Sequence, residues 1–295
     1  WFIVRKIYSN VYYTHFTLVD NILFTLLDII FYTHNFYVLV VLMVVKRHQW
    51  FKLIHNLQFV ECQVNFPHKS HWLAIILAHM VFCAITISGM TVYFVIFDIT
   101  YVELNFVDCF ENYSLFFHTV CTCVVLSLLL SRYKRQILFL KRENINKVHC
   151  NMYLLKKSVD IFNDIFGWMI LLDVCYGAIK CLTYINLMVK NENIVRNLWL
   201  QFYGVSLLTS IWARIVTTIL LCDAILKKYE DIFNVAFRIK CSTNNRKFRS
   251  ILAVVSHNRP EFRAARFFLI DRSLLFSIFD SVTTFTLVIL QFKPS

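Results

Sequence analysis

Six apolar stretches, each close to the length of a membrane-crossing helix, constrain the fold of this chain more than any other feature of its sequence. The hydrocarbon core of a bilayer is crossed by about 20 residues of α-helix. Most of these stretches lack the regularly spaced polar face that a helix of a soluble protein shows. We therefore predict an all-α, multi-span helical membrane protein. The predicted spans are Ile22–Val45, Trp72–Phe97, Leu115–Leu130, Ile165–Val189, Leu198–Cys222 and Leu269–Phe292.

The composition agrees with this prediction and excludes several other classes of protein. Of the 295 residues, 58% are hydrophobic and 16% are charged. Soluble proteins carry about 45–50% apolar and about 25% charged residues. The chain has only 4 Gly and 3 Pro, the residues that disordered segments and the turns of soluble all-β proteins require. Disorder is therefore excluded, and a soluble all-β fold is disfavoured.

The sequence also lacks the motifs of enzymes and of metal or cofactor sites. It contains no HExxH, GxSxG or Walker-type loop. The 10 Cys form no CxxC pair, and the 10 His show no ligand spacing on one helix, so we expect no bound metal and no cofactor. The net charge of +12 is divided among separate loops instead of lying on one face, which argues against nucleic-acid binding.

The charges of the loops predict how the spans are oriented. The loops Lys46–His71, Ser131–Asp164 and Asp223–Phe268 contain 22 of the 30 Lys and Arg residues. Cytoplasmic loops of membrane proteins carry this excess of positive charge. The intervening segment Asp98–Ser114 has no Lys or Arg, and it contains the glycosylation sequon that begins at Asn112. We therefore place the three basic loops in the cytoplasm and Asp98–Ser114 outside, with Asn112 as a candidate glycosylation site.

This orientation puts both ends of the given chain outside the cell. The first residue is Trp1 and no signal peptide is visible, so we expect the start to be truncated. Membrane proteins without a signal peptide mostly start inside the cell, and one further span would then precede Trp1. We predict a complete protein of seven spans with an extracellular C-terminus.

The end of the chain carries a motif. Thr284-Phe285 is followed, after five residues, by Gln291-Phe292. The arrangement resembles the signature of insect gustatory receptors, T-Y, five mostly apolar residues, then Q-F, which ends their seventh span. The stretch from Phe262 to Leu275 resembles the region that precedes this signature in the family. A weaker likeness covers His149, Asn163 and Phe166-Gly167. The chain departs from the signature in two places, because Phe285 replaces Tyr and Thr286 replaces an apolar residue.

The resemblance implies a function and an architecture. Insect gustatory receptors are ligand-gated non-selective cation channels in the plasma membrane of chemosensory neurons. They assemble as tetramers, either of one subunit or with partner receptor subunits, and they respond to small-molecule tastants. The likeness implies ligand-sensing helices in residues 1–222, a cytoplasmic anchor in 223–268 and a pore-lining last helix in 269–295.

The same resemblance supplies pore candidates. Gln291 is the only amide of the last predicted span and lies near its outer end. On its own, an amide at this depth is equally well explained as a residue at the headgroups. The family motif makes Gln291 a candidate for the outer gate or filter. The pore and gate candidates are Thr284, Leu287, Val288, Gln291 and Phe292.

A second group of residues is predicted to line the ligand pocket. Asp173, Tyr176, Lys180 and Tyr184 follow the spacing i, i+3, i+7 and i+11, which places them on one face of a span. Ionisable groups inside a membrane are costly and usually have a function. A structural Asp–Lys pair between helices explains the same pattern equally well. The remaining candidates are Asp28 and Tyr32, four residues apart on the first span, with Phe117, His118, Trp199, Phe202 and Tyr203 as aromatic walls.

Two further features bear on the structure. Arg214 lies in the middle of a predicted span and therefore needs an acid or water; Asp173 and Asp280 are candidate partners. Apolar residues recur with helical spacing in Asp223–Lys240, which predicts that the span Leu198–Cys222 continues as a cytoplasmic amphipathic helix. The polar segment Cys241–Arg249 that follows is predicted to be a loop.

Two other classes of seven-span protein are considered. G-protein-coupled receptors end inside the cell, whereas this chain is predicted to end outside. Ser131-Arg132-Tyr133 lacks the acid of their D-R-Y triplet, and the last span lacks N-P-x-x-Y. Transporters tend to show internal repeats and helices broken by Gly or Pro. Neither feature is apparent in this sequence, so both classes remain only as alternatives.

Overall fold

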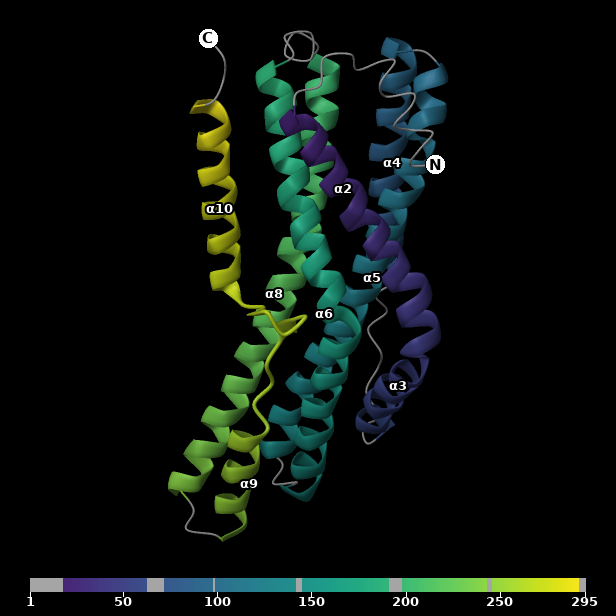
Figure 1. The fold of residues 1–295 in the computed structure, drawn as a ribbon. Coiled ribbons are helices and arrows are strands. Elements are labelled where there is room, and N and C mark those ends of the chain that lie inside the picture. Colours follow the sequence, from purple (N-terminus) through teal and green to yellow (C-terminus); the bar gives the residue numbers. More distant parts are fainter. Residues whose placement is uncertain are drawn as a thin grey trace.

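The computed structural model describes residues 18–62, 72–97, 99–141, 145–190, 198–242 and 246–291. It is a helical bundle with one short β-hairpin near its C-terminal end (Figure 1). The elements are α2 (Leu18–Phe36), the π-helix η1 (Tyr37–Val45), α3 (Arg47–Cys62), α4 (Trp72–Phe97), α5 (Ile99–Lys141), α6 (Ile145–Lys190), α8 (Leu198–Ser242), α9 (Arg246–His257), β1 (Arg263–Ala264), β2 (Phe268–Leu269) and α10 (Arg272–Gln291).

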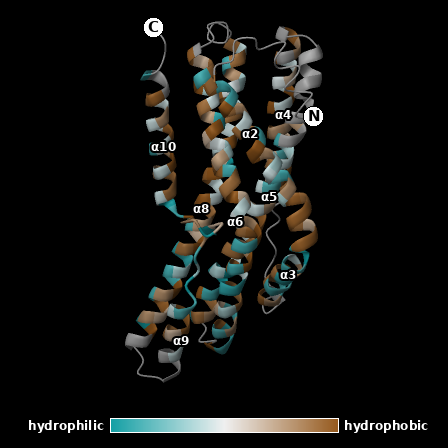
Figure 2. Cartoon of the chain, viewed as in Figure 1, coloured by the Kyte–Doolittle hydropathy of each residue, from teal (hydrophilic) through white to brown (hydrophobic). Residues whose placement is uncertain are grey.

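Three long helices form the frame of the molecule. Helices α5, α6 and α8 run along most of its length, and α2 crosses the upper half obliquely (Figure 1). Helices α3 and α9 lie at the lower end, while α10 stands beside the upper half of the bundle. The upper parts of the helices are predominantly apolar, and hydrophilic residues increase toward the lower end (Figure 2).

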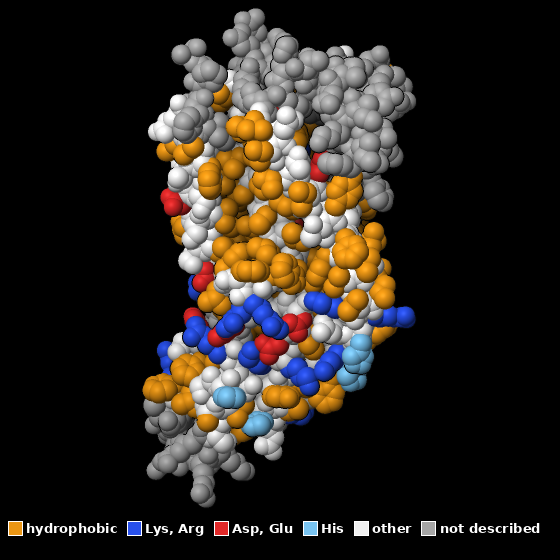
Figure 3. Space-filling view, in the orientation of Figure 1, with side chains coloured by type: hydrophobic (Ala, Val, Ile, Leu, Met, Phe, Trp, Pro, Cys, Tyr) orange, Lys and Arg blue, Asp and Glu red, His pale blue; other side chains and the backbone are white. Residues whose placement is uncertain are grey.

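This distribution is typical of a membrane protein whose helices extend beyond the bilayer. Figure 3 shows a broad band of hydrophobic side chains that ends at a belt of Lys, Arg, Asp and Glu. Large apolar side chains are exposed on α2, η1 and α4, including Leu18, Met43, Leu73 and Val95. A soluble protein rarely exposes apolar surface so extensively, whereas lipid tails solvate it.

Five helices of the described chain are long and apolar enough to cross a membrane, and they correspond to the first five predicted spans. They are Leu18–Val45, Leu73–Val92, Asn112–Lys141, Ile145–Val189 and Leu198–Ile239. The sixth predicted span, Leu269–Phe292, coincides with α10 over Arg272–Gln291. That α10 crosses the membrane, and that the complete protein has seven spans, stay predictions.

Several segments that the sequence suggested as loops are helical. The outer segment Asp98–Ser114 is part of α5 from Ile99 onward. Most of the basic loop Ser131–Asp164 consists of the end of α5 and the start of α6, and α3 occupies most of Lys46–His71. Because these segments contain almost no Gly or Pro, nothing in them ends a helix. The predicted span Leu198–Cys222 does continue as a helix past Asp223, as predicted. The predicted loop Cys241–Arg249 is wrong at its ends, where α8 extends to Ser242 and α9 begins at Arg246.

The densest core lies in the lower half of the bundle. The largest fully buried side chains include Tyr133 of α5, Phe162 and Phe166 of α6, and Phe262 before the hairpin. Phe162 stacks on Phe166, and its ring meets Phe262 edge-on with centroids 5.7 Å apart. This polar end of the bundle is therefore held by hydrophobic packing, because apolar burial is favourable where the helices extend beyond the hydrophobic band.

A two-stranded antiparallel hairpin connects this core to α10. Arg263 pairs with Leu269 and Ala264 with Phe268. The turn between the strands places Ala265 at φ 48° and Arg266 at φ 69°, a backbone region that few residues other than Gly adopt. This hairpin could not be predicted from the sequence, because Gly and Asn, the usual turn residues, are missing from it. The last helix consequently begins at Arg272 and not at Leu269.

Candidate functional site

The apolar upper half of the bundle contains a buried group of polar side chains. Asp173 of α6 is its centre, with a side chain only 17% exposed. The hydroxyl of Thr119 on α5 donates to Asp173 Oδ2 at 3.4 Å. The Nε2 atom of His34 on α2, whose side chain is fully buried, lies 3.9 Å from Asp173 Oδ1. Two neighbouring helices, α2 and α5, therefore present polar groups to the carboxyl group of Asp173 on α6.

A fourth helix contributes a guanidinium group. Arg214 of α8 is close enough to Asp173 and to His34 to interact with both electrostatically. His118 of α5 also faces this group, with its ring centroid 5.8 Å from that of His34. These five side chains, His34, His118, Thr119, Asp173 and Arg214, are called the buried polar cluster below. Of the two candidate partners for Arg214, Asp173 is therefore the neighbour.

Several polar atoms of the buried polar cluster are not used in hydrogen bonds within the described part of the chain. Among the described residues, no hydrogen-bond partner is found for either ring nitrogen of His34, for Asp173 Oδ1, or for the Nε and Nη1 atoms of Arg214. Buried polar atoms in native proteins are almost always hydrogen-bonded. The cluster therefore offers both donors and an acceptor to a polar group of a ligand, or to water, at the meeting point of α2, α5, α6 and α8.

A second tier of polar contacts lies along the same helices. The hydroxyl of Tyr176 on α6 donates to Asn112 Oδ1 on α5 at 2.9 Å, and Tyr176 is only 5% exposed. The side-chain amide of Asn186 on α6 hydrogen-bonds the buried Asp20 of α2. These contacts hold α6 against its neighbours. Asn112 lies half-buried within α5, and its glycosylation stays a prediction.

Two of the predicted pocket tyrosines fit against glycines of neighbouring helices. A Cβ atom on Gly204 of α8 would lie 2.1 Å from the ring of Tyr184, whose hydroxyl donates to the carbonyl of Gln201 at 3.2 Å. A Cβ on Gly89 of α4 would lie 2.0 Å from the ring of Tyr203. Both rings therefore take part in close helix packing, as small residues allow within membranes.

The structure divides the remaining pocket candidates into two groups. Asp28 and Lys180 are half-buried on α2 and α6. Four aromatic candidates are exposed on the surface of the chain, although the ring of Phe117 lies edge-on to that of His118 in the buried polar cluster, with centroids 5.9 Å apart. They are Tyr32, Phe117, Trp199 and Phe202, with exposed fractions of 44%, 46%, 69% and 69%.

The pore candidates lie on the exposed surface of α10. Thr284, Leu287, Val288 and Gln291 are all exposed in the single chain, and Phe292 lies outside the described residues. Helix α10 touches the bundle near its lower end, where Phe279 stacks on Trp212 of α8 with centroids 5.3 Å apart. Its start is fixed by Asp271, which accepts hydrogen bonds from the backbone of Ser273 and Leu274.

Sequence reasoning missed His34 and Thr119. Both lie in apolar runs of the predicted spans. A histidine in a predicted span was the available signal, because ionisable residues in membranes are rare. Their relation to Asp173 depends on how α2 and α5 pack on α6, which a single sequence does not show.

Together, the fold and this interior define a multi-pass helical membrane protein with a polar site among four of its helices. No protein-family profile and no curated protein sequence matches the chain. Among solved structures, its fold is similar to that of the insect olfactory receptor OR5 from Machilis hrabei, with a TM-score of 0.58. The similarity covers 92% of this chain and 77% of the receptor chain, at 15% sequence identity. The chain thus shares the fold of an insect chemoreceptor.

Proposed function

We propose that this chain is a subunit of a chemosensory, ligand-gated cation channel, and that it responds to taste compounds. The observation that carries the proposal is the similarity of fold to an insect olfactory receptor over nearly the whole chain. The C-terminal motif that ends in Gln291 and Phe292 supports the gustatory branch of such receptors. The coupled-receptor and transporter alternatives have no comparable support.

In this proposal the buried polar cluster and the tyrosines next to it form the ligand site. A small polar molecule could hydrogen-bond Asp173, His34 and Arg214 at the atoms for which the described residues provide no hydrogen-bond partner. Ligand sites are commonly apolar cavities with a few convergent polar groups, and the surroundings of the cluster have this character. The exposed Trp199 and Phe202 would then lie at lipid or at a neighbouring subunit.

Helix α10 is proposed to line a pore at the centre of a tetramer. Most of its side chains are exposed in the single chain, among them Phe276 at 75% and Leu287 at 55%. Polar Thr284 and Gln291 share this helix with apolar Leu287 and Val288, a mixture that suits a pore with an apolar gate. The lower end of α8, together with α9 and the hairpin, is the proposed anchor between subunits.

The oligomeric state tests this proposal without knowledge of the ligand. We expect the complete receptor, purified in lipid nanodiscs, to show the mass of four subunits by light scattering. The paired variants Leu287→Asp, on the accessible face of α10, and Leu73→Asp, on α4, probe the role of that helix. Cation flux into liposomes should change for Leu287→Asp and not for Leu73→Asp. A monomer that carries no flux, alone or co-expressed with a partner receptor, would overturn the proposal.

A further inference from the structure

One turn of α6 is held by two different parts of the chain. From the side of α2, the hydroxyl of Tyr37 donates to the backbone carbonyl of Ile165 at 3.1 Å. The ammonium group of Lys46 hydrogen-bonds the carbonyl of Asp164 and lies 2.8 Å from the hydroxyl of Tyr37. These carbonyls belong to a helix and already have backbone partners, so the two side chains add a second, tertiary set of bonds to the same turn.

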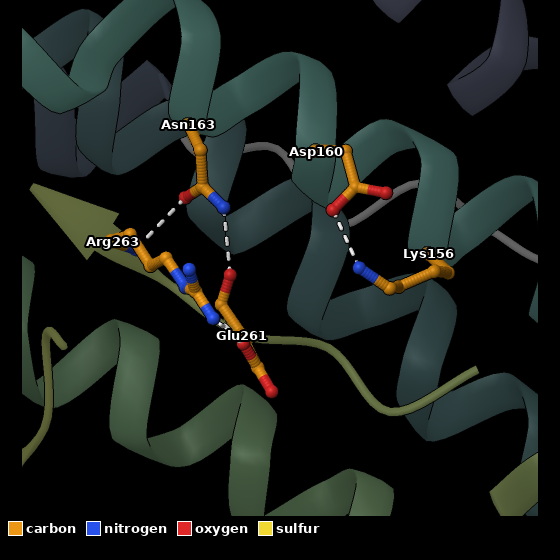
Figure 4. Close-up of polar contacts among 5 residues, drawn as sticks. All are labelled: Lys156, Asp160, Asn163, Glu261 and Arg263. Atoms are coloured by element: carbon orange, nitrogen blue, oxygen red, sulfur yellow. Dashed lines mark hydrogen bonds and ion pairs between the residues drawn. The ribbon is translucent and has the colours of Figure 1, made fainter. Parts of the chain in front are cut away.

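The same turn also holds the β-hairpin. The side-chain amide of Asn163 donates to the carbonyl of Glu261 at 2.7 Å, and its Oδ1 accepts from the backbone amide of Arg263 at 3.1 Å (Figure 4). A Cβ on Gly167 would lie 2.9 Å from two backbone atoms of the hairpin, Ala265 N and Arg263 O. The hairpin backbone therefore rests directly on α6, without intervening side chains.

Tyr37 and Lys46 bracket an unusual element. They stand at the first residue of the π-helix η1 and immediately after its last, Val45. The backbone amide of Lys46 donates five residues back, to the carbonyl of Val41 at 2.8 Å. π-Helical turns are rare and occur frequently at functional sites. A shift of this segment to α-helical hydrogen bonding would change the direction of the residues beyond it. Such a shift would turn Lys46 away from Asp164.

This element begins beside the buried polar cluster. His34 precedes Tyr37 by three residues on the continuous helix formed by α2 and η1, and it is fully buried against Asp173. On the other side, β2 leads through Asp271 into α10, and Arg272 is fixed to Asp223 of α8 with Nε and Oδ2 2.6 Å apart. The residues between His34 and α10 thus form an unbroken series of direct contacts.

We propose that the turn Asn163–Gly167 of α6 is a coupling junction, through which the winding of η1 controls the position of the hairpin and of α10. As an account of gating, the proposal rests on the proposed function. As a statement about coupling between η1 and the hairpin, it does not. Tyr37, Lys46 and Asn163 are its positioning residues. The contacts from η1 and the contacts from the hairpin both act on this one turn of α6. Coupling between two such sites is reciprocal, so a change at either one affects the other.

Amide hydrogen exchange of the complete receptor in nanodiscs tests the junction without any ligand. Tyr37→Phe removes one hydroxyl and keeps the ring. We expect it to speed exchange at Phe267 and Ile270, whose backbone amides are hydrogen-bonded within the hairpin, by about threefold to tenfold. The matched control is Tyr153→Phe on the exposed face of α6, which should leave these amides unchanged.

The reverse direction gives an independent readout. Asn163→Ala, which acts only on the hairpin side, should speed exchange in Tyr37–Val45 by a similar factor. Lys46→Met should reproduce the effect of Tyr37→Phe, and Lys46→Arg should restore slow exchange, while Lys52→Met on α3 is the control for loss of a positive charge. Thermal melting identifies any variant that unfolds globally.

The outcomes separate the two proposals. Unchanged hairpin exchange in both Tyr37→Phe and Lys46→Met, in folded protein, would overturn the junction whatever the channel does. Changed exchange together with absence of cation flux would support the junction and contradict the proposed function. If flux is present, folded Tyr37→Phe receptor should also show an altered basal flux at equal surface density, whereas Tyr153→Phe should not.

Discussion

Asp173 and Arg214 are two opposite charges that lie near each other in the apolar middle of this bundle. The carboxylate is the anion that electrostatically compensates the guanidinium, although the two groups are not in direct contact. A buried charge that loses its counter-charge is strongly destabilising, while removal of both charges together is often harmless. The stability of the upper half should therefore depend on the pair more than on either residue.

This dependence is testable with a double-mutant cycle. We expect Asp173→Asn to lower the free energy of unfolding by about 3–5 kcal/mol, or roughly 6–20 °C in melting temperature. The double variant Asp173→Asn with Arg214→Gln should recover at least half of this loss, measured by thermal melting in nanodiscs. Asp160→Asn, on the same helix but 54% exposed, should change stability little. Strictly additive effects of the two substitutions would show that the pair does not interact.

At the scale of elements, the contact between α6 and the hairpin depends on the lack of a side chain at Gly167. The atoms that a Cβ would meet there are backbone atoms of Arg263 and Ala265, which cannot move without distorting the hairpin. At Gly177 of the same helix, a Cβ would lie 2.7 Å from Cδ1 of Ile215, the flexible end of a side chain. The two glycines therefore differ in what an added methyl group would displace.

Gly→Ala substitutions at these two positions form a matched pair. Overpacking a close contact costs about 1–3 kcal/mol. We expect Gly167→Ala to lose this amount, because backbone must shift, and Gly177→Ala to lose clearly less, because Ile215 can change rotamer. Thermal melting of the two variants measures the difference. Equal losses would mean that the hairpin backbone yields as easily as a side chain.

The same elements show what the sequence could and could not predict. Five apolar helices of membrane-crossing length were predicted correctly, because a run of about 20 apolar residues matches the thickness of the hydrocarbon core. The helical extensions with many basic residues were partly taken for loops, since the basic residues obscure the helical periodicity of their apolar residues. The hairpin was missed because Ala265 and Arg266 adopt positive φ without the usual turn residues. Its conformation is imposed by Asn163 and Gly167, which are about 100 residues away.

The candidate site divides in a similar way. Helical spacing placed Asp173 and Tyr176 on one face, and both side chains do point into the bundle. His34, Thr119 and Arg214 approach Asp173 from three other helices, and only the tertiary packing reveals this. The exposed positions of Trp199 and Phe202 show the converse limit, since an aromatic residue in a span suits a pocket wall and a lipid-facing surface equally well.

At the scale of the whole molecule, the charges and the direction of the helices together predict the orientation in the membrane. The charged belt lies on the lower side of the hydrophobic band (Figure 3), and α9 and the lower part of α8 lie beyond it. From the hairpin at this level, α10 runs back along the apolar part of the bundle (Figure 1). If positive charge marks the cytoplasm, Gln291 at the end of α10 lies toward the outside.

Epitope labelling of intact cells tests this orientation. A tag added after Ser295 should bind antibody without permeabilisation, because α10 carries the C-terminus to the outer side. A tag inserted between Ser242 and Arg246, at the junction of α8 and α9, should bind only after permeabilisation. The two insertions control for each other, since both report on the same folded receptor. Reversed labelling would place the basic belt outside and remove the basis for assigning Gln291 to the outer end of a pore. Labelling of both tags only in permeabilised cells would show instead that α10 does not cross the membrane, and the pore would then have to be formed by other helices.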